Sequence, residues 1–455
     1  MGGKAAERFN QLRKRILWDI KPSKEELQET VYLVNQLSSR LRKSVQKDVE
    51  IRVTGSISRG TNLKGNADID IFLLFSTKFK KDYIIKKGLE YGKKALRKGD
   101  SFEIKYAEHP YVRLYLNDLN IKADIVPAFK IDSIEKMGTA VDRTPLHTDF
   151  INSKFNEKMR DDTRILKYLL KMNGIYGAEI KISGFSGYLC ELLIYYFGSL
   201  EKLCEMLPKA KLPIVIGSKR GDEYEATKRF GSSFVVIDPV DKNRNVAAGV
   251  SKESLSKAIL LLRRLHENPG EDLFLGVRYS SDDVGKKLDE LISSLGLNTY
   301  LLKVKSSRKT DDIIWPQARK SADMLKAYAE KYGFRIYLDL VFMFKDSPYI
   351  FFASPKEEIN TLVQKGPSVF MPKAVEDFMK HHRDAKGFTI NGECVYGLVP
   401  NKYPTLAAFM YDVSSGKIIG KRKDIDFSKC EFFFCEVPEK IKEALYIEIS
   451  RKLSA

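Results

Sequence analysis

The pattern of hydrophobic and polar residues predicts an amphipathic helix near the start of the chain, at residues 23–46. Apolar residues recur there every three or four positions, a spacing that places them on one helical face; they are Leu27, Val31, Val34, Leu37 and Leu41. Ser23 stands before this run and Glu26 follows three residues later, which is the pattern of a capping box. We therefore expect the helix to begin just after Ser23.

Short apolar runs with strand character follow this helix. They lie at residues 49–54, 68–75, 102–107, 112–116 and 121–126. Between the second and third runs, residues 78–98 have helical character and carry nine Lys and Arg against two acidic residues. Such a charge fits a surface that faces RNA and a solvated helix face equally well. Together these elements predict a first domain of mixed α and β structure, residues 1–150.

The remainder of the chain predicts two further domains, which makes the fold class α+β multidomain. Residues 151–270 are expected to be mainly helical, with helices at 161–173, 187–197 and 254–266. Residues 271–455 have the order helix, strand, helix, strand, strand, which suggests a ferredoxin-like sheet; the elements are expected at 283–294, 299–304, 316–332, 334–344 and 349–353. A more irregular tail is expected to follow residues 391–395.

Two acidic residues open the apolar run at residues 68–75, and their spacing predicts a metal site. Successive side chains of a strand point to opposite faces, so Asp68 and Asp70 share one face of an otherwise apolar strand. A divalent cation removes the repulsion between them, and carboxylate oxygens are the ligands that Mg²⁺ prefers. Asp124, the one acidic residue of the run at 121–126, completes a site for two metal ions if its strand lies beside the first. The alternative is that Asp68 and Asp70 are edge-strand charges that deter aggregation.

A glycine-serine turn directly before these carboxylates predicts a phosphate-binding site. Gly55 and Ser56 can present backbone N–H groups and a hydroxyl to a phosphate, and Arg59 can neutralise its charge. A phosphate cradle beside a carboxylate metal site is what phosphoryl transfer requires. We therefore expect an enzyme whose catalytic residues are Asp68, Asp70 and Asp124.

The composition agrees with a polyanionic partner without requiring one. The 455 residues include 78 Lys and Arg against 60 Asp and Glu, a net charge of +18. That excess suits RNA, but also general solubility or a lysine-rich, heat-adapted proteome. The five cysteines form no C-x-x-C pair, and no apolar run approaches the length of a membrane span. We expect a reduced, cytoplasmic setting.

The turn and the carboxylates resemble the polymerase beta-type nucleotidyltransferase superfamily, whose G-S-x-x-R-G-T, D-x-D and later Asp they match. Further blocks resemble the archaeal-type (class I) CCA-adding enzymes, which are tRNA nucleotidyltransferases. These blocks lie at residues 106–112, 140–147, 173–179, 184–193 and 238–248. The resemblance implies a polymerase beta-like head, a helical neck, and a C-terminal body and tail that bind tRNA.

The resemblance also implies a reaction and a set of site residues. Enzymes of this family add and repair the 3′-terminal CCA of tRNA, using CTP and ATP without a nucleic-acid template. Two Mg²⁺ ions would be held by Asp68, Asp70 and Asp124, and a homodimer is implied as well. The positions that match the family's nucleotide ligands and its base-selecting block are Ser56, Arg59, His147, Lys167 and Tyr176, followed by Arg244 and Asn245.

Other interpretations are open on the sequence alone. His147 could be a surface histidine, and Lys167 a solvated lysine on a helix. Tyr176 could be a packed aromatic, and Arg244 could pair with a nearby acid. A poly(A) polymerase shares the head motif, although the blocks at 143–147 and 238–248 argue against it. A non-catalytic RNA-binding protein has no reason to keep three like charges clustered.

Overall fold

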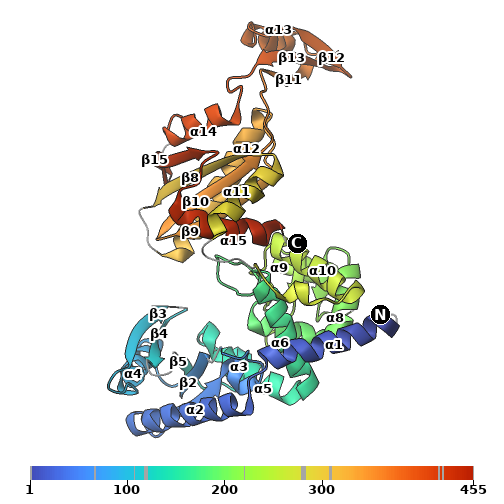
Figure 1. The fold of residues 1–455 in the computed structure, drawn as a ribbon. Helices are drawn as coiled ribbons and strands as arrows, with labels where there is room; N and C mark the ends of the chain where they lie inside the picture. The colour runs from blue at the N-terminus through green and yellow to red at the C-terminus, as the bar shows by residue number, and fades with distance from the viewer. Residues whose placement is uncertain are drawn as a thin grey trace. The chain divides into compact units, whose positions relative to one another are not determined.

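The computed structural model of the chain describes residues 3–65, 68–106, 108–116, 121–219, 221–277, 283–306, 310–418, 421–422 and 425–453. It divides into two compact units, which meet in sequence between Gly276 and Val277. Figure 1 shows the elements of both units, and each unit is described by itself. Within the described ranges, no helix is both long enough and apolar enough to cross a membrane.

A five-stranded sheet forms the first part of the N-terminal unit. Its order is β1 (Glu50–Thr54), β2 (Asp68–Phe75), β5 (Ile121–Phe129), β4 (Pro110–Leu116), β3 (Ser101–Tyr106). Strands β2 and β5 are parallel, and the other neighbours are antiparallel. All five strands occur where the hydrophobic pattern predicts them; β2, β4 and β5 each have several buried residues, whereas β3, at the edge of the sheet, has none.

Two helices cover one face of this sheet. They are α2 (Lys24–Ser44) and α4 (Lys81–Lys94), whose buried side chains form one core with Ile69, Ile71, Ala123 and Ile125. The Ser23 side chain accepts a hydrogen bond from the backbone N–H of Glu26, so α2 begins where the sequence predicts. Side chains alternate along a strand, so the acidic residues of β2 and β5 lie on the face opposite these helices.

The second part of the N-terminal unit is mainly helical and has its own core. It contains α5 (Thr144–Lys154), α6 (Glu157–Met172), α7 (Gly187–Phe197), α8 (Leu200–Met206), α9 (Glu223–Phe230) and α10 (Lys252–Glu267), with a parallel pair formed by β6 (Ile214–Ile216) and β7 (Phe234–Val236). Helix α1 (Gly3–Ile20) joins the same core through Phe9, Leu12, Ile16 and Ile20. The sequence analysis assigned no element to this segment, although these four residues recur every three or four positions.

The C-terminal unit is built on a five-stranded antiparallel sheet covered by helices on both faces. The strand order is β14 (Lys421–Arg422), β15 (Ile425–Phe434), β8 (Asn298–Ser306), β10 (Ser347–Ser354), β9 (Leu338–Phe344). Alternate residues of β10 enter different cores: Ile350 and Phe352 pack with α12 (Asp311–Lys331) and α14 (Leu406–Ser414). Tyr349 and Phe351 pack with α11 (Val284–Leu295) and α15 (Lys442–Leu453).

Two sequence predictions about this unit are wrong in detail. The helix expected from Pro316 begins at Asp311, because Asp311 and Asp312 favour the first turn and Pro316 removes only one backbone hydrogen bond. The segment expected to be an irregular tail is regular. It contains β13 (Cys394–Pro400), α14, β15 and α15. Strand β13 is the middle strand of a three-stranded sheet with β11 (Thr361–Ser368) and β12 (Phe388–Asn391), and α13 (Pro372–His381) lies between these two strands in sequence.

Candidate active site

The strand register brings the three predicted carboxylates to one end of one sheet face. Strands β2 and β5 are parallel neighbours, and Asp70 is the direct partner of Asp124 across them. Asp68 lies two residues before Asp70 on the same strand and therefore on the same face. Asp68 is exposed, whereas Asp70 and Asp124 are partly buried. The arrangement excludes the edge-strand interpretation, since β2 lies between β1 and β5.

The clustering of negative charge changes the pKa of the Asp70 carboxyl. Burial, together with the charges of Asp124 and Asp68, raises the pKa of the Asp70 carboxyl to about 7, although Arg59 and Arg113 oppose the shift. A carboxyl with that pKa holds its charge at a free-energy cost, which a divalent cation would remove.

Arg113 on β4 binds the carboxylate of Asp124 on the neighbouring strand β5. It is the cross-strand partner of Asp124, and its Nε and Nη2 each donate to one oxygen of that carboxylate at 2.7 Å. Hydrogen bonds to Asp124 raise the pKa of Arg113 above its usual range. The sequence reading missed this partner. Its signal was a single arginine in the middle of an apolar strand.

The donor set suits Mg²⁺, but the side chains are not gathered around a common point. Among the described residues, no group of three His, Cys, Asp or Glu is arranged so that it could hold a metal ion. The bidentate contact with Arg113 accounts for this in part, because it engages both oxygens of Asp124. Three carboxylates on adjacent strands, one of them with a raised pKa, nevertheless provide the oxygen ligands that Mg²⁺ requires. The residues present therefore fit the predicted ion.

The glycine-serine turn packs directly on Asp70. It forms a five-residue helix, α3 (Gly55–Arg59), that follows β1 without a break. Gly55 has φ +73°, and a Cβ built on it would lie 1.9 Å from Asp70 Oδ2. Only glycine allows this backbone to approach the carboxylate so closely. The turn therefore places Ser56 and Arg59 next to the acidic strand.

Arg59 and Lys167 meet at a buried carboxylate that the sequence reading did not single out. Arg59 Nε lies 2.9 Å from Glu191 Oε2, and Lys167 Nζ lies 3.2 Å from Glu191 Oε1. Lys167 also donates to the carbonyl and the hydroxyl of Thr61, at 3.2 and 3.0 Å. Because Lys167 is 2% exposed, it is not a solvated helical lysine.

Tyr176 lies beside Lys167 at the start of α7. A Cβ at Gly187 would be 3.1 Å from Tyr176 Oη and 3.5 Å from Lys167 Nζ, so both polar groups approach the same point. Burial raises the pKa of Tyr176 well above its usual range, so its hydroxyl stays protonated. The structure thus brings Arg59 together with Lys167 and Tyr176, which come more than 100 residues later in the sequence.

His147 and Arg244 share a second buried carboxylate, Asp238. His147 Nε2 and Arg244 Nη1 approach Asp238 Oδ2 at 2.9 and 3.0 Å, and the Tyr188 hydroxyl donates to Oδ1 at 3.0 Å. The His147 and Tyr188 rings stack with centroids 4.0 Å apart. Despite its burial, these bonds lower the pKa of Asp238 to about 2, and burial lowers the pKa of His147. Asp238 therefore fixes the orientation of both predicted ligands.

Asn245 has its side-chain amide engaged within its own loop. Its Oδ1 accepts from the backbone N–H groups of Val236 and Ala247, and its Nδ2 donates to the carbonyl of Phe234. These bonds shape the loop that carries Arg244. The part of Asn245 in base selection stays a prediction.

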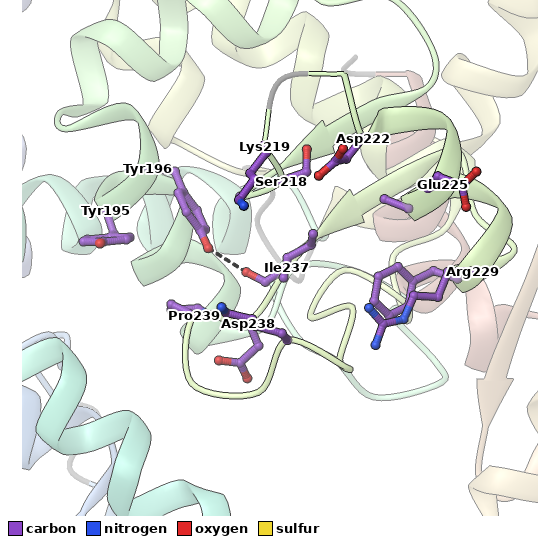
Figure 2. Close-up of a pocket in the computed structure, with 14 residues that line it drawn as sticks. Tyr195, Tyr196, Ser218, Lys219, Asp222, Glu225, Arg229, Ile237, Asp238 and Pro239 are labelled. Carbon is purple, nitrogen blue, oxygen red and sulfur yellow. Dashed lines mark hydrogen bonds between the residues drawn. The ribbon is translucent and has the colours of Figure 1, made fainter. Parts of the chain in front are cut away.

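A cavity of about 640 Å³ lies on one side of the Asp238 loop. It is lined by residues of α7 and α9, of the loop before α9 and of the segment after β7, and the Tyr196 hydroxyl donates to the Ile237 carbonyl at 2.7 Å. Figure 2 shows the Asp238 carboxylate pointing away from Lys219 and Asp222, toward the side opposite these cavity residues. The His147 and Arg244 contacts therefore belong to the other side of the loop.

Three family profiles match consecutive parts of the chain. They are the nucleotidyltransferase domain over residues 34–147, the second domain of tRNA nucleotidyltransferase over 161–275, and the C-terminal domain of CCA-adding enzyme over 296–424. Among solved structures, one of Cid1, described with RNA terminal uridylyl transferase activity, covers 60% of this chain and 99% of its own at 15% identity, with a TM-score of 0.49.

Curated relatives are similar over most of their length. The CCA-adding enzyme of Methanocaldococcus jannaschii is 35% identical over 84% of this chain and 87% of its own. That of Archaeoglobus fulgidus is 34% identical over 82% of each chain. The CCA-adding enzyme of Methanococcus maripaludis strain C7 is 31% identical over 97% of this chain and 98% of its own. Similarity of this extent, over all three matched domains, shows that the chain belongs to the CCA-adding enzymes and is a tRNA nucleotidyltransferase.

Proposed function

We propose that this enzyme adds and repairs the 3′-terminal CCA of tRNA, with CTP and ATP and without a nucleic-acid template. The tRNA 3′-hydroxyl oxygen attacks the nucleotide α-phosphate, a phosphodiester bond forms, and pyrophosphate leaves with the electrons of the broken P–O bond. The observation that carries the proposal is the pairing of Asp70 with Asp124 on parallel strands beside the Gly55 turn, in a chain of this family.

Asp68, Asp70 and Asp124 are the residues that would hold Mg²⁺. Two such ions, when bound, supply Lewis-acid activation of the hydroxyl and neutralise charge on the phosphates. The chain's own contribution is to gather three carboxylates on adjacent strands, and Arg113 would hold the Asp124 carboxylate until an ion takes its place. Positioning and charge stabilisation then carry the reaction, and no covalent enzyme intermediate is required.

The nucleoside triphosphate would lie between the Gly55 turn and the start of α7. Ser56 offers a hydroxyl, Arg59 and Lys167 offer positive charge, and Tyr176 offers a protonated hydroxyl. Such donors, fixed before the reaction, stabilise the charge that develops on the departing pyrophosphate. We assign these four residues to the triphosphate.

His147 and Arg244 would contact the sugar and base. Arginine presents a rigid fork of donors, and Asp238 orients that of Arg244. The fixed geometry supports selection of C and A by protein groups, with Asn245 supporting the loop. We further propose that the enzyme works as a homodimer in the cytoplasm. Light scattering on the purified protein tests whether it is a dimer.

The test is nucleotide incorporation into tRNA transcripts that end in the discriminator base, in C or in CC. With Mg²⁺ and a single labelled nucleotide, CTP should add two residues to the first transcript, and ATP one residue only to the transcript ending in CC. EDTA should abolish both additions. Unlimited addition of A to any 3′ end would instead indicate a poly(A)-type enzyme.

A further inference from the structure

Glu191 is a buried acid in an otherwise apolar helix. It is the single acidic residue of α7, whose neighbours Cys190, Leu192 and Leu193 are all in the core. Its side chain is 0% exposed. A buried carboxylate is retained only with compensating partners, because isolating the charge from water is expensive. The partners therefore indicate what this residue does.

Among the described residues, the polar contacts of the Glu191 side chain come from groups around the proposed triphosphate site. Thr61 Oγ1 donates to Oε1 at 2.5 Å, Lys167 Nζ lies 3.2 Å from the same oxygen, and Arg59 Nε lies 2.9 Å from Oε2. Although burial opposes ionisation, the charges of Arg59 and Lys167 lower the pKa of Glu191 below its usual range. One carboxylate thus joins the head turn α3 to helices α6 and α7.

The contact with Arg59 is close without being a full hydrogen bond. Arg59 Nε and Glu191 Oε2 are buried and have no aligned hydrogen-bond partner among the described residues. Arg59 is 8% exposed and its Nε is buried against Glu191 Oε2, so the pair lies out of bulk water.

We propose that Glu191 is a positioning residue for the nucleoside triphosphate. It holds Arg59 and Lys167 together before the substrate arrives and balances their mutual repulsion. In the proposed site, Lys167 then contributes its positive charge, and Arg59 contributes its charge and guanidinium N–H groups to the phosphates. The inference rests on the proposed function, in which these two cations bind the triphosphate. It adds that their placement depends on one carboxylate from the helical part of the unit.

The test compares Glu191→Gln with Asp162→Asn. Asp162 is also 0% exposed, but it pairs with Arg13 and accepts from the backbone N–H of Leu200, outside the site. The readout is the ratio of CTP affinity to CMP affinity for each purified protein, measured by calorimetry, because this ratio isolates the β- and γ-phosphates. Unfolding temperature and tRNA binding are recorded in parallel.

Glu191→Gln should lower the CTP-to-CMP ratio by at least about tenfold, since an amide cannot compensate two cations. Asp162→Asn should lower the unfolding temperature and leave the ratio unchanged. A wild-type ratio in Glu191→Gln, or an equal fall in Asp162→Asn, would overturn the proposal. If wild-type protein itself shows no preference for CTP over CMP and no incorporation, the proposed function fails instead.

A second variant covers the case in which Glu191→Gln does not fold. Thr61→Val removes one donor to Glu191 and one acceptor of Lys167 while keeping all three charges. Its CTP-to-CMP ratio should fall in the same direction, by roughly threefold. An unchanged ratio in folded Thr61→Val would equally overturn the positioning role.

Discussion

Replacing Gly55 by alanine tests whether the turn must touch the catalytic strand. Gly55 has φ +73°, and its added Cβ would lie 1.9 Å from Asp70 Oδ2 and 2.9 Å from Asp70 Cγ. Ordinary contact begins at 3.4 Å, so the carboxylate or the turn must retreat by 1.5 Å, the difference between 3.4 and 1.9 Å. A displacement of this size at reacting groups lowers kcat by about 10²-fold, which is ~2.7 kcal/mol of barrier.

Gly65 supplies a matched control on the same segment. Its φ of +68° is nearly the same, but nothing lies within 4 Å of its added Cβ. Alanine at either position therefore carries the same backbone penalty of roughly 1–2 kcal/mol. The contact with Asp70 is the difference between the two variants.

The assay is single-turnover addition of C to a tRNA transcript at saturating CTP, with unfolding temperatures measured beside it. Gly55→Ala should lose activity by about two orders of magnitude, whereas Gly65→Ala should lose a similar amount of stability and keep its rate. Wild-type rates in Gly55→Ala would refute the reasoning. Equal loss in the two variants would show that backbone strain, and not the contact with Asp70, determines the rate.

Three further predictions follow from the charges. Arg113→Gln should lower the free energy of unfolding by roughly 1–3 kcal/mol in EDTA. In urea titrations, Mg²⁺ should reduce this difference in stability between wild type and variant, because the cation replaces the guanidinium beside Asp124. A difference that is the same with and without Mg²⁺ would contradict this role. The folded pKa of Asp238 is depressed to about 2 from the ordinary 3.8, so its stabilisation of about 2 kcal/mol is complete above pH 3.8 and is lost as the pH falls toward 2. Asp238→Asn should show correspondingly less acid sensitivity in urea titrations at pH 5.5 and pH 2.5. With a net charge of +18, tRNA binding should weaken more than about tenfold between 50 and 200 mM KCl in filter binding, and a flat response would exclude phosphate contacts as the main source of affinity.

Local sequence determined the elements and the type of chemistry. The period of two along residues 68–75 is sufficient to place Asp68 and Asp70 on one face, and the side chain of Ser23 is sufficient to start α2. These features depend on neighbours within a few residues, so they can be recognised without knowing the fold. The nucleotidyltransferase motifs are local in the same way.

Tertiary structure alone decided which residues complete the site. Glu191 and Asp238 bind predicted site residues from distant segments, and Arg113 binds Asp124 across a pair of neighbouring strands; the sequence analysis assigned none of these three partners. The sequence likewise does not predict that α1 packs on the helical core rather than on the sheet that follows it in sequence. A buried charge needs a compensating partner, and the fold, not the spacing along the chain, selects that partner.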